Sequence, residues 1–339
     1  MTPTDSVRLP RLLSLSGFLF ALLALATACG VEQQAPLEVA QQGGGEVGAE
    51  APAPDLGLAD LLASSLPPAA ETAPPSVSPM PVAWAGAPHP RLPALPPVPV
   101  LNARAAVLMD EASGVVLFDK DAHSPLPPAS LTKIATLILA LESGRLDEWV
   151  DVDVDSRAMP GSTIMGLEPG DRFRLHDLLY GLMLPSGNDA ALAIGRFLAG
   201  SDAAFVAEMN HLTARLGLTE SNFLNPHGLG GGLHATSAYD LAMLSRYGMS
   251  LPGFREIVTA TSWRAEGSRT LLLNNINTFL SYPGADGLKT GYTRSAGSTL
   301  AASATRNGHR LFAIILNSPT RDDDARRLLN WAFTNLTWD

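Results

Sequence analysis

The chain has 339 residues, of which 46% are hydrophobic and 17% are charged, with a formal net charge of −10 and a single cysteine. This acidic balance lacks the basic footprint of a nucleic-acid-binding protein and argues against a polybasic attachment to anionic membranes. One cysteine cannot form an intrachain disulfide, so the core must hold the fold without covalent crosslinks.

Residues 1–29 are typical of an export signal. Arg8 and Arg11 form a positive start, the apolar stretch 12–28 follows, and Cys29 comes directly after small residues. This segment resembles a bacterial lipobox, in which the cysteine is lipid-modified after cleavage, although Ala26 stands where leucine is usual. We expect a lipoprotein anchored at Cys29. An uncleaved anchor and a secreted form are the alternatives, and all three place the remainder outside the cytoplasm.

Residues 30–98 predict a linker. The segment is rich in Ala, Pro, Gly and Glu and has no sustained apolar periodicity. A flexible coil of this length spans on the order of 45 Å. We therefore expect a disordered tether that lets a globular domain, residues 99–339, reach away from the membrane.

The globular part begins with a predicted β-hairpin, because apolar runs at 105–109 and 115–118 flank a turn-forming segment. Residues 172–180 are predicted as a helix, and a second helix is predicted over 189–198. The residues between these two helices include Pro185 and Gly187, which break helices. They predict a tight loop that presents its side chains into a cleft.

The glycine-rich stretch 228–232 lacks a following G-K-[ST] pattern, so it is a turn or mobile loop and no phosphate-binding loop. Residues 236–240 predict the start of a helix that continues to about Tyr247. No H-E-x-x-H or comparable histidine spacing is present, and the sequence predicts neither a metal nor a cofactor.

The C-terminal part predicts a sheet covered by a helix. Strand-like runs at 298–305 and 310–316 are joined by Asn307 and Gly308, a hairpin turn pair. Residues 321–336 predict an amphipathic helix that packs on this sheet. Its apolar residues are Leu328, Leu329, Trp331 and Phe333.

A Ser–Lys pair precedes the apolar stretch 134–141. Pro127 and Pro128 favour an extended entry, so Ser130 falls in or next to the first helical turn with Lys133 on the same face. A capping box would place Glu or Gln at this lysine, because the helix N-terminus is the positive end of the macrodipole. Burial and the dipole lower a lysine pKa, and a serine beside a neutral amine is an activated nucleophile.

The chain has only three lysines, Lys120, Lys133 and Lys289, against twenty arginines. Lysine can shift its pKa whereas arginine stays charged, so this composition points to lysine-specific roles. Two further motifs follow the S-x-x-K pair: S-x-N at Ser186 and Asn188, then K-T-G from Lys289. The three motifs in this order are the set found in penicillin-binding proteins and class A β-lactamases.

These residues suffice for acyl transfer. Ser130 would attack, Lys133 would accept its proton, and the backbone N–H of Ser130 would stabilise the oxyanion. A strand edge at the K-T-G motif would pair with an extended peptide, and Gly291 allows close backbone approach. Lys289 and Thr290 would bind a negative group, most simply a free carboxylate. A serine acylator that binds a carboxylate on the leaving side is a carboxypeptidase.

From Ala105 onward the sequence resembles the low-molecular-mass penicillin-binding proteins, the serine-type D-alanyl-D-alanine carboxypeptidases of the S11 type. The resemblance extends beyond the three motifs to the stretches 225–229, 286–293, 296–297 and 328–333. It implies an α/β (α+β) fold of the β-lactamase/transpeptidase type, with a five-stranded antiparallel sheet flanked by helices plus a helical lobe.

The same resemblance implies roles for further residues: Ser186 as a proton shuttle, Asn188 as a ligand of the acyl-side peptide, and the N–H of Tyr292 as second oxyanion donor. The expected substrate is a peptidoglycan stem peptide ending in D-Ala-D-Ala, with β-lactam antibiotics as covalent inhibitors at Ser130. Many members add a C-terminal β-domain and an anchor helix. The residues after Gly291 are all needed to finish the catalytic domain, so we expect the N-terminal segment to provide the attachment.

Three alternatives remain open on the sequence. A β-lactamase would need a deacylating glutamate, and Glu220 lies one residue too far from Asn225 for the E-x-x-L-N pattern. A D,D-endopeptidase would use the same residues. A non-catalytic penicillin sensor or wall-binding protein would need none of them.

Four further polar residues receive structural interpretations. His227 is interpreted as a hydrogen-bonding residue and no base. Asp189 and Asp240 are interpreted as helix-start residues. For Arg321, carboxylate binding and a surface or capping role are both open.

Overall fold

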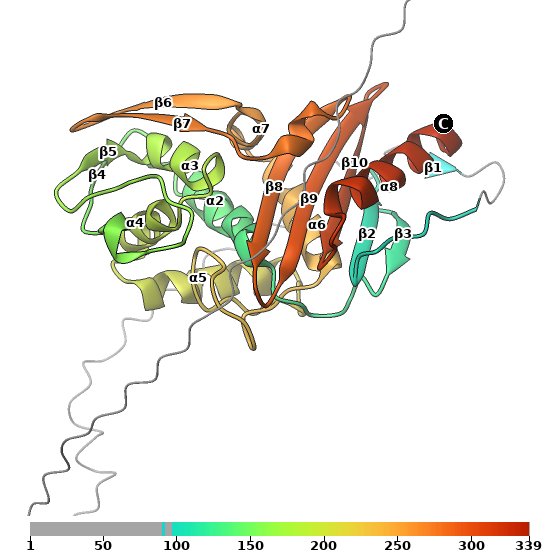
Figure 1. The fold of residues 1–339 in the computed structure, drawn as a ribbon, viewed down its shortest axis with the longest axis horizontal. Helices are drawn as coiled ribbons and strands as arrows, with labels where there is room; N and C mark the ends of the chain where they lie inside the picture. Colours follow the sequence, from blue (N-terminus) through green and yellow to red (C-terminus); the bar gives the residue numbers. More distant parts are fainter. Residues whose placement is uncertain (1–89, 92–96, 339) are drawn as a thin grey trace, which may run out of the picture. The chain divides into compact units, whose positions relative to one another are not determined.

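The computed structural model describes residues 90–91 and 97–338. The predicted export signal with Cys29, and the linker up to residue 89, lie outside the described residues. The central element is a five-stranded antiparallel sheet in the order β3-β2-β10-β9-β8 (Figure 1). Its strands are β2 (Ala105–Asp110), β3 (Val116–Lys120), β8 (Ala285–Thr293), β9 (Gly297–Arg306) and β10 (His309–Leu316).

The sheet is apolar on both faces. Strand β2 is buried along its whole length, with Val107 and Met109 in the core of the helical lobe and Ala106 and Leu108 in a second core. Successive side chains of a strand point to opposite faces, so this unbroken apolar run is what a doubly covered sheet requires. The predicted hairpins at 105–118 and 298–316 are confirmed as β2–β3 and β9–β10.

Helix α8 (Arg321–Asn335) covers one face of the sheet, as the amphipathic pattern predicted (Figure 1). The turn between β9 and β10 places Asn307 at φ 51° and Gly308 at φ 82°. Both values lie in the left-handed region, which two-residue hairpin turns of this kind require and which Asn-Gly tolerates well. The residues of this turn therefore allowed the β9–β10 hairpin to be predicted from the sequence.

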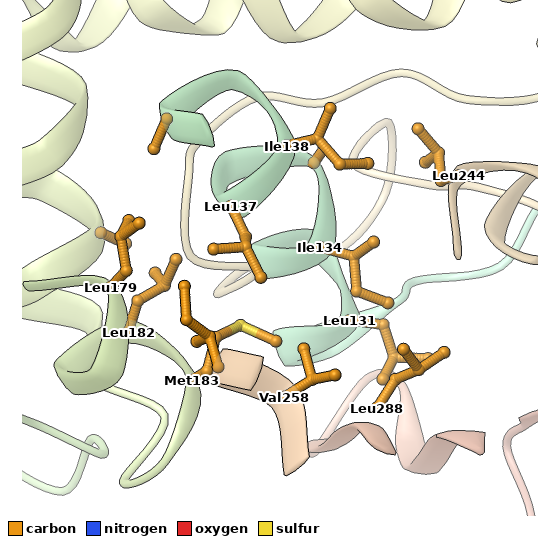
Figure 2. Packing of buried hydrophobic residues seen from close by; sticks show 14 of the residues in the cluster. Leu131, Ile134, Leu137, Ile138, Leu179, Leu182, Met183, Leu244, Val258 and Leu288 are labelled. Carbon is orange, nitrogen blue, oxygen red and sulfur yellow. The ribbon is translucent and has the colours of Figure 1, made fainter. Parts of the chain in front are cut away.

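Helices pack on the other face, and most of them form the lobe to the left in Figure 1. They are α2 (Lys133–Glu142), α3 (Leu175–Met183), α4 (Asn188–Ala199), α5 (Asp202–Arg215), α6 (Ala238–Met249) and α7 (Phe254–Thr259). Helix α2 lies at the centre. Figure 2 shows Leu137 facing Leu182 and Met183 of α3, and Ile138 on the side of Leu244 from α6. Each fully buried Leu or Ile contributes roughly 1.5–3 kcal/mol, so α2 is held firmly in place.

One predicted helix begins later than expected. Residues 172–180 were expected to be helical throughout, but Arg172–Arg174 form strand β5, which pairs with β4 (Trp149–Asp151), and α3 starts only at Leu175. The reason is local: Phe173 is buried between two exposed arginines, which is the period of a strand and not of a helix.

Several short elements complete the described chain. The hairpin β6 (Ser262–Glu266) and β7 (Thr270–Asn274) runs past α3 along the top of Figure 1. Within the predicted linker, β1 (Pro90–Arg91) pairs with β11 (Thr337–Trp338) near the C-terminus. The 3₁₀ turns are η2 (Ala129–Thr132), η3 (Ser156–Ala158) and η4 (Thr278–Ser281).

In the described part of the chain, no single helix combines the length and apolar character needed to cross a bilayer. The bent pair of α4 and α5 reaches that length and composition only when both helices are counted together.

Candidate active site

The predicted Ser–Lys pair meets at the entry to helix α2. Ser130 lies in the 3₁₀ turn η2, and Lys133 is the first residue of α2, so the prediction of a position in or next to the first turn is confirmed. The Nζ atom of Lys133 lies 3.1 Å from the hydroxyl oxygen of Ser130. The nucleophile and its base are thus within direct hydrogen-bond reach, as an activated serine requires.

Lys133 is fully buried, and its amine also donates to the side-chain oxygen of Asn188 at 2.6 Å and to the carbonyl of His227 at 2.8 Å. Burial is the main cause that lowers the pKa of Lys133 well below its ordinary value of 10.5. The positive charge of Lys289 lowers this pKa further, and the carboxylate of Asp189 acts in the opposite direction. A lowered pKa makes the neutral, proton-accepting amine available.

The S-x-N motif forms the loop between α3 and α4, as predicted. Ser186 has a left-handed backbone with φ 65°, and Asn188 begins α4. Thr163 fixes this loop, because its hydroxyl donates to the carbonyl of Ser186 at 2.8 Å while its carbonyl accepts from the N–H of Asn188 at 2.9 Å. The hydroxyl of Ser186 has no hydrogen-bond partner among the described residues.

The K-T-G motif lies on β8, the edge strand of the sheet, which packs beside η2. Gly291 is needed for this approach, because a Cβ atom there would lie 2.5 Å from the hydroxyl of Thr299 and 3.0 Å from the backbone nitrogen of Ser130. The outer edge of β8 is unpaired by any described strand. It can therefore accept an extended peptide.

Lys289 is buried, and its amine donates to the carbonyl of Thr290 at 3.0 Å. Burial and the nearby positive charge of Arg321 lower the pKa of Lys289 to about 7. Arg321 is the first residue of α8 and donates to the carbonyl of Gly291 at 2.9 Å. Arg321 also pairs with Asp322 at 3.2 Å, whereas Lys289 has no carboxylate partner among the described residues. The buried amine therefore suits a ligand that brings its own negative charge.

Six of the eight predicted site residues line one cleft of about 280 Å³, namely Ser130, Ser186, Asn188, Thr290, Gly291 and Tyr292. Lys133 and Lys289 are buried and do not belong to its lining. Arg321 does, which favours the carboxylate-binding alternative for this residue. Five further residues line the cleft but belong to none of the three motifs and were not predicted as site residues: Gly161, Ser162, Thr163, Leu229 and Ile276.

The acidic residues considered on the sequence lie elsewhere. The lining of the cleft contains no Asp or Glu, and Glu220 pairs instead with His123 at 2.9 Å. Asp189 accepts hydrogen bonds from three backbone N–H groups in residues 165–167 and from its own helix start. Asp240 lies in the first turn of α6 and accepts from Ser221. Both aspartates therefore have the structural role that the sequence predicted.

His234 is buried and His227 is half-buried, and both lie close to the residues around the Ser–Lys pair. His227 accepts at Nδ1 from the N–H of Leu229, and its carbonyl holds Lys133, in line with the predicted structural role. Burial lowers the pKa of both histidines from 6.5 to about 4, and for His227 the positive charge of Lys133 adds to the effect.

These two histidines should make the fold sensitive to acid. The unfolded chain binds protons on them below about pH 6.5 while the folded chain does not, so their contribution is fully present above that pH and is lost as the pH falls toward 4. Each shift corresponds to at most about 3 kcal/mol. We expect the free energy of unfolding, measured with urea between pH 7 and pH 4, to fall. His234→Gln should flatten this slope, and an unchanged slope in that variant would contradict the assignment.

Comparisons with known proteins identify the family. The family model described as D-alanyl-D-alanine carboxypeptidase (peptidase S11) matches residues 94–320. The D-alanyl-D-alanine carboxypeptidase DacF of Bacillus subtilis (strain 168) is 35% identical over 247 residues, which cover 69% of this chain and 62% of DacF. The chain thus spans less than two thirds of the length of this curated relative.

Solved structures give the same result for the fold. The Streptomyces K15 DD-transpeptidase matches with a TM-score of 0.67 and 31% identity, covering 70% of this chain and 100% of the other. Penicillin binding protein 6B from Escherichia coli matches with a TM-score of 0.66 and 36% identity, covering 71% and 80%. The predicted transpeptidase-like fold is confirmed. Because the family model matches most of the chain, the protein belongs to the peptidase S11 family, the D-alanyl-D-alanine carboxypeptidases.

Proposed function

We propose that the protein is a serine-type D-Ala-D-Ala carboxypeptidase that removes the terminal D-alanine of peptidoglycan stem peptides through an acyl-enzyme on Ser130. The observation that carries this proposal is the 3.1 Å approach of the Lys133 amine to the Ser130 hydroxyl at the wall of a cleft that the K-T-G strand also lines. Family membership and the names of the relatives support it.

In the acylation step, the neutral amine of Lys133 takes the proton of Ser130 while the serine oxygen attacks the carbonyl carbon of the penultimate D-alanine. The N–H groups of Ser130 and Tyr292 bind the developing oxyanion. The C–N bond to the terminal D-alanine then breaks, and the leaving amine receives a proton, with Ser186 as the shuttle. Water next hydrolyses the ester and restores the serine.

The substrate is held by both walls of the cleft. Its backbone extends along the free edge of β8, and Asn188 binds the peptide on the acyl side. Its terminal carboxylate lies near Lys289, Thr290 and Arg321. Binding of that anion stabilises the protonated form of Lys289, whose pKa in the free protein is lowered to about 7.

A β-lactam would acylate Ser130 in the same way and leave slowly. Fast hydrolysis of the acyl-enzyme in a class A β-lactamase uses a glutamate as base, whereas the lining of this cleft contains no carboxylate. The pairing of Glu220 with His123 outside the cleft argues against its recruitment for that step. We therefore favour a carboxypeptidase that β-lactams inhibit over a β-lactamase.

We also propose that the domain works in the cell envelope, outside the cytoplasm, and is attached to a membrane through Cys29. The export signal and lipobox resemblance of residues 1–29 support this proposal. Labelling the full chain with a radioactive fatty acid in a bacterial host should mark the wild type and not Cys29→Ser. Equal labelling of both would contradict attachment at this cysteine.

The function is tested by intact-mass spectrometry of the full chain. After incubation with benzylpenicillin, we expect one stable penicilloyl group on Ser130, because no cleft carboxylate activates water. A peptide ending in D-Ala-D-Ala should lose one D-alanine per turnover. Consumption of penicillin without an adduct would mean a β-lactamase. An adduct without D-alanine release would mean an endopeptidase or a sensor, and neither event would mean a scaffold.

A further inference from the structure

A buried hydrogen-bond chain ends on the residue before the nucleophile. The hydroxyl of Thr132 donates to the carbonyl of Ala129 at 2.9 Å and lies 2.9 Å from Nε2 of His234. At the other end of the imidazole, Nδ1 accepts from the backbone N–H of Leu224 at 3.0 Å. Thr132 and His234 are both buried, so this chain is shielded from water.

The direction of donation along these hydrogen bonds follows from the groups at the two ends. A backbone N–H can only donate, so Nδ1 of His234 is the acceptor, and the proton of the neutral ring sits on Nε2. Nε2 therefore donates to Thr132, whose single hydroxyl proton goes to Ala129. These hydrogen bonds end on a carbonyl oxygen, which does not take up a proton at neutral pH. The hydrogen-bonded row can therefore orient groups but cannot carry a proton to the reaction.

Ala129 has an unusual backbone that needs such support. Its φ of 52° lies in the left-handed region, which is unfavourable for a residue with a Cβ atom. Gly228 packs directly against its carbonyl, since a Cβ atom on Gly228 would lie 1.9 Å from that oxygen. The preceding carbonyl, of Pro128, is held separately by Thr299 at 3.1 Å. The two carbonyl groups that precede Ser130 are thus each held by their own contacts.

The carbonyl of Ala129 and the N–H of Ser130 belong to the same peptide unit. Such a unit is planar, so fixing the direction of its C=O fixes the direction of its N–H. That N–H is one of the two oxyanion donors in the proposed mechanism. Stabilisation of an oxyanion depends on donors that already point to where the charge develops.

We propose that His234 is a positioning residue that, through Thr132, holds the Ala129–Ser130 peptide plane and so aims the oxyanion N–H of Ser130 at the tetrahedral intermediate. The proposal rests on the proposed function, because an oxyanion forms only if Ser130 is acylated. Neither His234 nor Thr132 lines the cleft, and neither is a hydrogen-bond partner of the Lys133 amine. Their effect should therefore appear in the rate of the chemical step and not in ground-state binding.

The experiment compares two threonine variants in the full chain. Thr132→Val keeps the shape and removes the hydroxyl, and Thr132→Ser keeps the hydroxyl. Loss of one oxyanion donor costs about 10²–10³-fold in rate, and misdirection should cost less. We expect Thr132→Val to lower the first-order rate of acylation by benzylpenicillin, and kcat for D-alanine release, by about 10–100-fold, with KM changed less than about threefold. Thr132→Ser should recover most of the rate.

Thr213 supplies a matched control. It is buried in α5, and its hydroxyl also donates to the carbonyl three residues earlier, that of Asn210, at the same 2.9 Å. Thr213→Val should therefore cost similar stability in thermal unfolding but leave the acylation rate unchanged. Equal rate losses in Thr213→Val and Thr132→Val would overturn the proposal, because the loss would then reflect general destabilisation.

A spectroscopic readout reports the oxyanion site directly. The infrared stretching frequency of the ester carbonyl in the acyl-enzyme should rise in Thr132→Val, since its oxygen receives weaker hydrogen bonds, and stay at the wild-type value in Thr213→Val. If Thr132→Val does not fold, His234→Leu gives the same comparison against His234→Gln, which keeps an N–H donor.

The two proposals fail in different ways. A wild-type protein that neither forms the penicilloyl adduct nor releases D-alanine would refute the proposed function. The role of His234 alone would be refuted by a different result. In that case the wild type is active, and a folded Thr132→Val variant reacts at the wild-type rate with an unchanged carbonyl frequency.

Discussion

Replacing Ser130 with alanine should lower the release of D-alanine by at least about 10⁴-fold and abolish the penicilloyl adduct. The variant keeps the cleft and its cations but has no oxygen to form the ester. Its fold should be retained, because the serine hydroxyl is only one of three partners of the Lys133 amine. Asn188 and the carbonyl of His227 remain to satisfy that buried group. D-alanine release and intact mass measure the loss, and thermal unfolding measures the fold.

Ser245→Ala is the matched control for this prediction. Its hydroxyl is buried in α6 and donates to the carbonyl of Leu241, away from the cleft, so that variant should acylate like the wild type. A Ser130→Ala protein that still formed the adduct would show that another residue is the nucleophile. Peptide mapping of the adduct would then identify it, and Ser186, in the same cleft, would be examined first.

Much of the fold was predictable where local chemistry leaves few choices. Asn307 and Gly308 specify their hairpin because few other residues accept positive φ at both turn positions. The apolar run of α2 predicts a helix buried all round, and Figure 2 shows it at the centre of the lobe. Residues 172–174 were mistaken for helix because three alternating residues are too few to distinguish the strand period from the helix period.

The site was predictable for a related reason. Lys133 and Arg321 are each the first residue of a helix, where the macrodipole disfavours a positive charge. In Lys133 this local misfit pointed to catalysis. The same misfit at Arg321 was left open on the sequence, and only the structure shows that the residue lines the cleft. Misplaced charge was therefore informative at Lys133, whereas at Arg321 it could be interpreted only with the structure.

His234 gave no comparable signal. It follows a glycine-rich stretch, its partner Thr132 lies 102 residues away, and neither residue is charged or misplaced in its own element. Only tertiary packing brings the imidazole to the threonine. Positioning groups of this kind satisfy every local rule, so a single sequence cannot reveal them.

The same substitution, Lys→Arg, can be made at each of the three lysines, so their different roles can be compared directly. At Lys133 the change should lower kcat for D-alanine release by about 10³-fold, since arginine stays protonated and cannot take the proton of Ser130. At Lys289 the positive charge remains, so we expect a loss of about tenfold, mainly as a higher KM, from one poorly placed hydrogen bond. Lys120 is the control: its amine donates to the carbonyl of Leu101, which a guanidinium also does, and activity should stay within about twofold.

These outcomes separate charge from basicity. If the site required only positive charge at Lys133, the Lys133→Arg and Lys289→Arg variants would lose similar amounts of activity. A folded Lys133→Arg variant with a near wild-type kcat would refute the assignment of Lys133 as the base. A larger loss at Lys289 than at Lys133 would instead make the K-T-G lysine the proton acceptor. The lowered pKa of about 7 permits this, but the Lys289 amine bonds the carbonyl of Thr290, and Lys133 is the lysine that contacts Ser130. The chain otherwise uses arginine for nearly every cation, so the buried lysine beside Ser130 is best explained by the one property that arginine lacks, the ability to lose its proton.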